Sequence, residues 1–219
     1  MIFGDDPEPN ADFETRRNQM VDSLLEAGQI ERPETEAAMR AVPRHEFVPE
    51  NRRSDAYDDR PLPIGHDQTI SAPHMVATMC DRLELSDGDR VLEIGTGCGY
   101  HAAVTAEIVD TRVYSVEYEP TLAEHARTRL DRLGYDVAVR SGDGHDGWSE
   151  HAPYDATYLT CAAASVPESL VEQLRDGGRI VAPIESKRGR QRLLRGVKRD
   201  GTLDRTYHGG VRFVRMRGG

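Results

Sequence analysis

The segment Val91-Leu92-Glu93-Ile94-Gly95-Thr96-Gly97-Cys98-Gly99-Tyr100 places three alternating glycines between a short apolar run and the start of a helix. Glycine has no Cβ atom, so a loop of this kind lets the backbone approach a ligand closely. A tight strand-to-helix turn with no ligand is the alternative. Three glycines weaken such a turn without need, and a nucleotide-type cofactor is therefore the favoured interpretation.

The spacing of these glycines favours one cofactor. It is G-x-G-x-G, whereas the dinucleotide fingerprint is G-x-G-x-x-G and holds a pyrophosphate at a helix N-terminus. An acid, Glu93, stands two residues before the first glycine. The pattern therefore favours S-adenosylmethionine over a nicotinamide dinucleotide. The predicted cofactor-binding residues of this segment are Glu93, Gly95, Thr96, Gly97 and Gly99.

Around the glycine segment, apolar runs alternate with helical spacing. Strands are expected at 91–94, 113–116, 137–139 and 156–159, and helices at 100–109, at 122–133 and around Leu170, Val171 and Leu174. This alternation is typical of an α/β fold with a doubly wound, mainly parallel, Rossmann-like sheet and helices on both faces. Runs at 193–197 and 211–216 flank Asp200-Gly201, which predicts an antiparallel C-terminal hairpin.

The residues before this core read as a helical and loop extension. One helix is predicted to end at Gly28, and a second lies between Pro33 and Pro43. An ordered loop at 43–68 follows, and a third helix begins after Ser71. We expect a single domain over 1–219, with a flexible arm at 1–11, the extension at 12–84 and the Rossmann-like core at 85–219.

Acidic residues follow the second and third predicted strands. Glu117 ends the second strand, where a carboxylate can accept hydrogen bonds from both hydroxyls of a ribose; Glu119 is the competing candidate. Asp143-Gly144 follows the third strand and is placed to bind an adenine amino group, although an ordinary Asp-Gly turn would explain it too. Both acids are expected at the carboxyl edge of the sheet, where open α/β folds bind ligands.

The composition excludes several classes of protein. The 219 residues include 38 acids and 28 bases, which gives a net charge of −10, and no run is apolar enough to cross a bilayer. We therefore expect no nucleic-acid or membrane partner and a cytoplasmic location with reduced cysteines and no metal site. All but two of the bases, Lys187 and Lys198, are arginines. This acidic, lysine-poor balance suggests a salt-rich cytoplasm, with GC-rich coding bias as the alternative for the arginines.

Several further motifs reveal a resemblance that spans about residues 20–216. They are Val42-Pro43-Arg44-His45-Glu46-Phe47-Val48-Pro49, Ala56-Tyr57-Asp58-Asp59, Ile64-Gly65, Gln68-Thr69-Ile70-Ser71-Ala72-Pro73, the glycine segment, Gly142-Asp143-Gly144 with Gly147-Trp148, and Val211-Arg212-Phe213-Val214. Together they resemble the protein-L-isoaspartate O-methyltransferases, which are class I S-adenosylmethionine-dependent enzymes. The Gln-Thr-Ile-Ser-x-Pro element is specific to that family, whereas the glycine loop is shared with many methyltransferases.

The resemblance implies a reaction and a set of substrate residues. The family methylates the free carboxylate of isoaspartyl residues in damaged proteins, converts S-adenosylmethionine to S-adenosylhomocysteine and uses no metal. Ser71 corresponds to the family's active-site serine, and Thr69, Ile70 and Val214 to substrate-binding positions. A monomer is expected. On local sequence alone, capping of the following helix is the favoured role for Ser71, and the Gln68-Thr69-Ile70-Ser71 context reverses this preference.

Three residues depart from the family pattern. Cys98 stands where serine is common and His101 where glutamine is common, and Asp67 replaces a small residue. A carboxylate at Asp67 would repel an anionic substrate if it faced the site.

The rival functions are a methyltransferase for another carboxylate or small molecule, a protein that binds S-adenosylmethionine without turnover, and a nicotinamide oxidoreductase, which the glycine spacing disfavours.

Overall fold

The computed structural model describes residues 9–219, with side chains from Asp12 onward. The helices are α1 (Pro9–Glu26), α2 (Pro33–Ala41), α3 (Pro73–Leu83), α4 (Tyr100–Val109), α5 (Pro120–Leu133) and α6 (Glu168–Gln173). The strands are β1 (Leu62–Gly65), β2 (Gln68–Ile70), β3 (Val91–Ile94), β4 (Val113–Glu117), β5 (Val137–Ser141), β6 (Tyr154–Leu159), β7 (Leu174–Glu185), β8 (Gln191–Arg199) and β9 (Thr202–Val211). Proline begins α2, α3 and α5, where its fixed φ suits the first helical turn.

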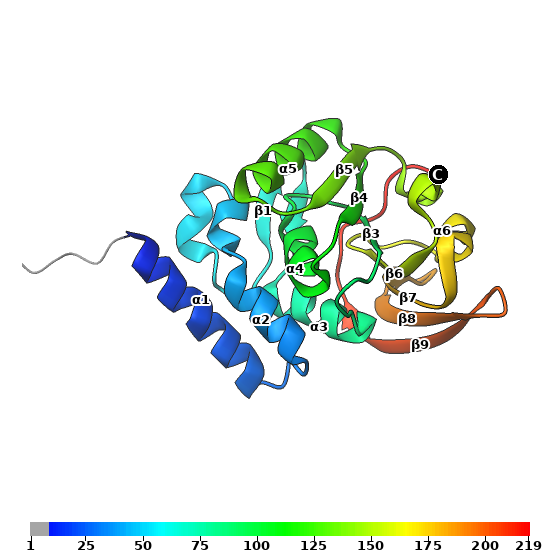
Figure 1. The fold of residues 1–219 in the computed structure, drawn as a ribbon, viewed down its shortest axis with the longest axis horizontal. Helices are drawn as coiled ribbons and strands as arrows, with labels where there is room; N and C mark the ends of the chain where they lie inside the picture. The colour runs from blue at the N-terminus through cyan, green and yellow to red at the C-terminus, as the bar shows by residue number, and fades with distance from the viewer. Residues whose placement is uncertain (1–8) are drawn as a thin grey trace, which may run out of the picture.

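Seven strands form one sheet in the order β5-β4-β3-β6-β7-β8-β9 (Figure 1). The five strands from β5 to β7 are parallel, and β8 and β9 continue the sheet in antiparallel pairing. Ile94 at the end of β3 pairs with Val116 of β4 and Leu159 of β6. The carboxyl ends of these three strands therefore lie level at one edge. The predicted Rossmann-like methyltransferase fold is confirmed.

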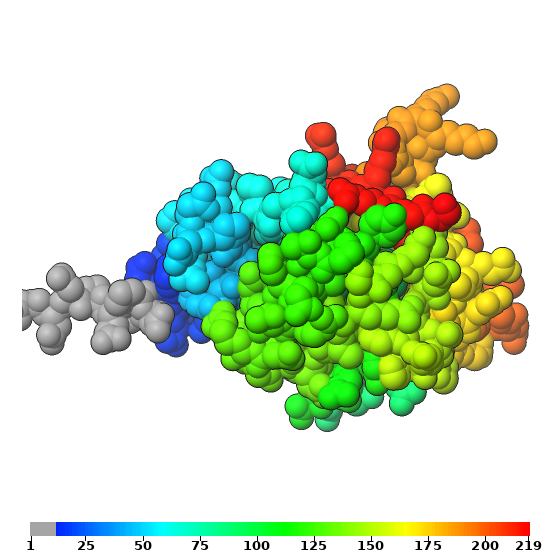
Figure 2. Space-filling view, turned by 90° about the horizontal axis from the view of Figure 1, so that it is seen from above, coloured from blue at the N-terminus to red at the C-terminus, as the bar shows by residue number. Residues whose placement is uncertain are grey.

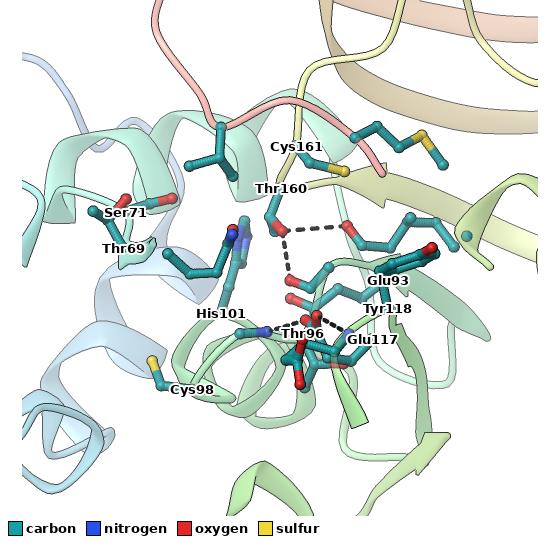
Figure 3. A pocket seen from close by; sticks show the side chains of 18 of the residues that line it. Thr69, Ser71, Glu93, Thr96, Cys98, His101, Glu117, Tyr118, Thr160 and Cys161 are labelled. Atoms are coloured by element: carbon teal, nitrogen blue, oxygen red, sulfur yellow. Dashed lines mark hydrogen bonds between the residues drawn. The ribbon is translucent and has the colours of Figure 1, made fainter. Parts of the chain in front are cut away.

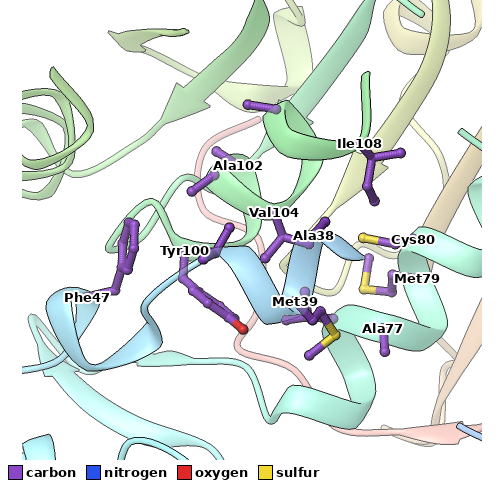
Figure 4. Close-up of a cluster of buried hydrophobic side chains, with 14 of the residues drawn as sticks. Ala38, Met39, Phe47, Ala77, Met79, Cys80, Tyr100, Ala102, Val104 and Ile108 are labelled. Carbon is purple, nitrogen blue, oxygen red and sulfur yellow. The ribbon is translucent and has the colours of Figure 1, made fainter. Parts of the chain in front are cut away.

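Each face of the sheet carries its own hydrophobic core. Successive side chains of a strand point to opposite faces, and accordingly Val91 belongs to one core and Leu92 to the other. Leu130 of α5 packs in the first core and Leu170 of α6 in the second. Figure 4 shows the first core where α2, α3 and α4 meet, around the fully buried side chain of Met39. Helices on both faces are thus confirmed.

The C-terminal hairpin is confirmed, but the prediction of its second strand is wrong. β8 and β9 meet at Asp200-Gly201, where both residues have positive φ angles. The second strand is β9, whereas the chain after Val211 leaves the sheet and returns to its carboxyl edge. β9 escapes detection because its side chains are largely exposed and polar, as is common in an edge strand. We call residues 212–219 the C-terminal tail.

The helix predicted through Leu174 ends one residue earlier, at Gln173, and Leu174 begins the long strand β7. No strand was predicted there. Gly177-Gly178 interrupts the apolar pattern, and the pairing of β6 with β7 is irregular between Leu174 and Arg179, across this point. Glycine pairs and bulges mask a strand in sequence because the alternation breaks where the chain bends.

The first two helices agree with the sequence. Gly28, with φ of 66°, follows the end of α1, and α2 lies between Pro33 and Pro43. Residues 1–8 of the predicted arm lie outside the described residues. Residues 9–11 belong to α1, so the prediction of an arm is wrong there, because Pro9 suits a first helical turn.

The predicted loop at 43–68 contains more structure than expected. It holds two 3-10 turns, Arg44–Phe47 and Glu50–Asp55, and the strand β1. β1 pairs with β2 in a small antiparallel sheet that leads directly into α3. Strands of four and three residues are too short to show a periodic pattern, so this hairpin was not predicted.

Candidate active site

A cavity lies at the carboxyl ends of β3, β4 and β6 (Figure 3). The glycine loop between β3 and α4 forms one wall, the β2–α3 connection forms another, and the C-terminal tail closes a third side. Figure 3 shows Thr69 and Ser71 across the cavity from Glu117. Among the predicted site residues, those that line the cavity are Thr69, Ile70, Ser71, Glu93, Gly95, Thr96, Gly97, Glu117, Gly144 and Val214.

The glycine loop adopts a conformation that other residues disfavour. Gly95 has φ of 98° and Gly97 has φ of 55°. A Cβ atom on Gly95 would lie 2.3 Å from Thr160 Oγ1, whose hydroxyl donates to the carbonyl oxygen of Ile94 at 3.2 Å. Position 95 therefore requires glycine for two reasons, its backbone angle and the packing of Thr160. Thr160 follows β6 and was not predicted to take part in the site.

Glu117 lies against the glycine loop, at the end of β4. Its Oε2 accepts a hydrogen bond from the backbone N–H of Gly97 at 2.8 Å, and its Oε1 accepts one from the N–H of Glu119 at 3.0 Å (Figure 3). These two bonds fix the carboxylate at the carboxyl edge, in the cavity wall. Glu119 lines the cavity as well, but Glu117 is the residue tied to the loop.

Glu93 is fully buried beneath the same loop. The hydroxyl of Ser115 donates to Glu93 Oε2 at 2.5 Å and lies 2.5 Å from Thr96 Oγ1, so the three side chains form a chain of hydrogen bonds. Burial raises the pKa of Glu93 to about 8, against the opposing effect of the bond from Ser115. Its Oε1 has no hydrogen-bond partner among the described residues.

Two predicted site residues lie outside the cavity wall. Gly99 caps the start of α4 with φ of 92°, and a Cβ atom there would lie 3.0 Å from Leu130 Cδ1, so close packing on α5 explains this glycine. Asp143 accepts hydrogen bonds from the N–H of His145 and of Gly219, both at 2.9 Å. These hydrogen bonds, that of His145 first, lower the pKa of Asp143.

Ser71 does not cap the helix that follows it. The N-cap of α3 is Ala72, and no side chain caps that position. The backbone N–H of His74 instead donates to Asp59 Oδ1 at 2.9 Å. The capping alternative for Ser71 is therefore wrong, because the chain enters the helix one residue later. Asp59 therefore satisfies one backbone donor in the first turn of α3.

Two arginines that were not predicted to take part in the site, Arg215 and Arg217, line the cavity. They reach it because the C-terminal tail pairs with the loop after β6: Ala162 N donates to Val214 O at 2.7 Å, and Met216 N donates to Ala162 O at 2.8 Å. Arg217 Nη1 lies 3.9 Å from Glu119 Oε2. The tail thus brings positive charge to the cavity of a chain whose net charge is negative.

The three departures from the family pattern differ in their placement. Cys98 and His101 line the cavity and are buried. Burial lowers the pKa of His101 to about 3, so its ring is neutral at physiological pH. Asp67 is exposed in the β1–β2 turn, with φ of 57°, and is not among the residues that line the cavity. The repulsion expected from an Asp67 that faces the site is therefore avoided.

The cavity has features that suit S-adenosylmethionine. Buried Glu93 Oε1 and His101 Nδ1 lack hydrogen-bond partners among the described residues, and unsatisfied buried polar atoms beside a cavity are suited to a polar ligand. The carboxylates in its wall suit a cationic cofactor.

Within residues 9–219, no group of three or more His, Cys, Asp or Glu residues is arranged to hold a metal ion. No helix in the described part of the chain has the length and apolar character that a membrane span requires.

The fold and the cavity at its carboxyl edge define a Rossmann-like α/β methyltransferase. The family model "Protein-L-isoaspartate(D-aspartate) O-methyltransferase" matches residues 15–219. The chain belongs to this family.

Individual relatives agree. The chain is 50% identical over 212 residues to protein-L-isoaspartate O-methyltransferase 2 of Archaeoglobus fulgidus, covering 94% of this chain and 95% of that protein. It is 48% identical over 210 residues to the Methanopyrus kandleri protein-L-isoaspartate O-methyltransferase, covering 94% and 93% of the two chains.

Solved structures are similar as well. A protein-L-isoaspartate O-methyltransferase superposes with a TM-score of 0.87 at 34% identity, covering 92% of this chain and 66% of that one. A Plasmodium falciparum protein, described as a putative protein-L-isoaspartate O-methyltransferase in complex with S-adenosyl-L-homocysteine, gives a TM-score of 0.82 at 25% identity. That match covers 92% of this chain and 98% of the other.

Proposed function

We propose that the chain transfers the methyl group of S-adenosylmethionine to the free carboxylate of L-isoaspartyl residues in damaged proteins and peptides, and so begins their repair to L-aspartyl. The observation that carries this proposal is the meeting of two motifs at one cavity. The segment from Gln68 to Ser71, specific to the family, lies across the cavity from the glycine loop and Glu117.

The cofactor residues divide by position. Gly95, Thr96 and Gly97 would bring backbone close to the cofactor, and Glu117 would accept hydrogen bonds from its ribose hydroxyls. Glu93 would support the loop from below. Asp143 and Gly144 would meet the adenine, which requires Asp143 to release the N–H of Gly219. Gly99 would act indirectly by fixing the start of α4. S-adenosylmethionine, when bound, supplies an electrophilic methyl group on its sulfonium.

The residues on the substrate side have a positioning task. A carboxylate with a pKa near ~4 is already ionised at neutral pH, so the site needs no general base. The Ser71 hydroxyl would donate a hydrogen bond to one oxygen of the isoaspartyl carboxylate and point the other toward the methyl group. Thr69, Ile70 and Val214 would hold the surrounding polypeptide. A carboxylate oxygen forms a new bond to the methyl carbon as the S–C bond breaks. The electron pair of the broken S–C bond stays on sulfur.

Further proposals concern the whole chain. We propose that it works as a monomer in the cytoplasm, without a metal and without a nucleic-acid or membrane partner. The single domain would comprise the extension at 12–84 and the core at 85–219. The acidic surface would be an adaptation to high salt. The supporting observation is the net charge of −10. Negative charge does not attract an anionic substrate, so substrate binding does not account for it.

An assay of the reaction product tests the function. Purified protein, labelled S-adenosylmethionine and an isoaspartyl peptide should give a base-labile methyl ester together with S-adenosylhomocysteine. Small carboxylic acids offered in the same assay should remain unlabelled. A methyltransferase with another substrate would label those acids instead, and a binding protein without turnover would bind S-adenosylhomocysteine but give no ester.

A further inference from the structure

A second hollow opens beside the active-site cavity. The turn from β7 to β8, the end of β9 and the C-terminal tail line this hollow. Figure 2 shows the tail, in red, on the same side of the molecule as the amber turn between β7 and β8. Arg215 lines both the cavity and the hollow. The two spaces are therefore neighbours, and a chain that leaves the cavity past Arg215 enters the hollow.

The hollow is strongly basic. Glu185 is the one carboxylate residue among those that line it, and it is already held by Arg215, whose Nη2 lies 2.7 Å from Glu185 Oε1. We call this hollow the basic groove and define it by its exposed cations Lys187, Arg190, Arg192, Arg212 and Arg215. A cluster of this kind is unexpected on a chain with a net charge of −10.

Most of this charge is uncompensated. Across the described residues, no carboxylate lies within 4.0 Å of the charged groups of Lys187, Arg190 or Arg212, whereas many other arginines of the chain are paired. Unpaired cations that line one groove create a local positive potential, which attracts anionic groups. The charge of the groove is therefore opposite in sign to the net charge of the chain.

The walls of the groove are fixed in place. Gln191 of β8 holds the tail: its Oε1 accepts from the N–H of Phe213 at 2.6 Å, and its Nε2 donates to the carbonyl oxygen of Phe213 at 3.1 Å. Arg192 donates to the carbonyl oxygens of Tyr207 and His208 and lies 5.2 Å from the ring of Tyr207. Tyr207 is 41% exposed, so its ring offers a flat surface in the groove.

We propose that the basic groove binds acidic side chains that flank the isoaspartyl residue in the substrate polypeptide, so that the enzyme prefers damage in acidic segments. This inference rests on the proposed function. A polypeptide whose isoaspartyl carboxylate reaches Ser71 must continue out of the cavity on both sides. On the side of Arg215 it meets cations free to pair with Asp or Glu, and this local attraction offsets the repulsion from the acidic surface.

The test uses matched isoaspartyl peptides whose flanking residues are either Glu or Ser. In dilute buffer, wild-type protein should show kcat/KM about tenfold higher for the Glu-flanked peptide, mainly through a lower KM, as two exposed charge pairs would give. Molar KCl should reduce this preference because salt screens exposed charges. The double variant Arg190→Glu, Arg212→Glu should reverse it.

The control is Arg205→Glu, which makes one such charge reversal on β9 at an exposed position that does not line the groove. It should keep the preference. Equal kcat/KM for the two peptides in wild type, or an unchanged preference in the double variant, would show that the groove does not bind substrate, while the proposed function would stand. Failure of both peptides to accept a methyl group would instead overturn the proposed function. The wild-type salt series needs no variant to fold.

Discussion

The hydroxyl of Ser71 lines the cavity and leaves the capping of α3 to other groups. Ser71→Ala should therefore lower kcat for an isoaspartyl peptide by about 10- to 100-fold, the loss expected for one hydrogen bond to a charged group. The free energy of unfolding should change by less than about 0.5 kcal/mol. Steady-state kinetics and urea unfolding of the same preparation check both values.

A matched control for Ser71→Ala is Asp59→Ala. This variant removes the acceptor that the N–H of His74 uses at the start of α3. It should cost about 1 kcal/mol of unfolding free energy, as the loss of a helix cap does. If Ser71→Ala showed that loss of stability with a normal kcat, its role would be structural.

Glu117 and Glu119 both line the cavity, and binding measurements distinguish them. Glu117→Gln should weaken S-adenosylhomocysteine binding by about 10- to 100-fold, because a charged acceptor for the ribose hydroxyls is lost. Glu119→Gln, the matched control, should have a smaller effect, since Glu119 lies toward Arg217. Isothermal titration calorimetry gives both dissociation constants. The reverse order would assign the ribose to Glu119.

Buried Glu93 should make stability depend on pH. Its pKa is raised from 4.5 to about 8, mainly by burial, so the folded protein keeps a proton that the unfolded chain releases. Unfolding free energy should therefore fall as the pH rises from 4.5 through 8. Burial lowers the pKa of His101 from 6.5 to about 3. This shift makes the unfolding free energy rise with pH, but only below pH 6.5, the pKa of His101 in the unfolded chain.

The window from pH 6.5 to 8 separates Glu93 from His101. There, wild-type protein should lose up to about 1.4 kcal/mol per pH unit relative to Glu93→Gln. Urea unfolding across this window measures the difference. Parallel stability curves for the two proteins would mean that Glu93 titrates normally.

At the level of elements, the glycine loop offers a comparison between two similar substitutions. In Gly95→Ala the new Cβ would lie 2.3 Å from Thr160 Oγ1, whereas in Gly97→Ala its nearest contact is Ile64 Cδ1 at 3.4 Å. Both positions have positive φ, which costs about 1–2 kcal/mol for a residue with a Cβ atom. Gly95→Ala should be the more destabilising of the two in thermal unfolding. Equal losses would show that Thr160 moves aside.

The elements that sequence predicted well are those with a local signal. β3, α4 and β4 are mainly apolar, and three alternating glycines mark the loop between β3 and α4. β7 contains a glycine pair, and β9 is an exposed edge strand, so neither shows such a pattern. Arg215 and Arg217 reach the cavity only because the tail pairs with Ala162. Ala162 and the tail are far apart in the sequence, so no local pattern indicates this contact.

At the scale of the whole molecule, the charge distribution predicts a response to salt. A net charge of −10 destabilises the compact state by self-repulsion, and salt screens exposed charges. The free energy of unfolding of wild-type protein should therefore rise from dilute buffer to molar KCl. Thermal unfolding without added denaturant measures this free energy. A free energy of unfolding that stays constant or falls as KCl rises would contradict the proposed adaptation to salt.

The most direct measurement compares one isoaspartyl peptide with its aspartyl twin of identical sequence, at saturating labelled S-adenosylmethionine, in both dilute buffer and molar KCl. The structure and the family predict that the label enters the isoaspartyl peptide and not the twin, and that Ser71→Ala greatly reduces this signal. Equal labelling of the two peptides, or no labelling of the isoaspartyl peptide under either condition, would contradict the proposed repair function.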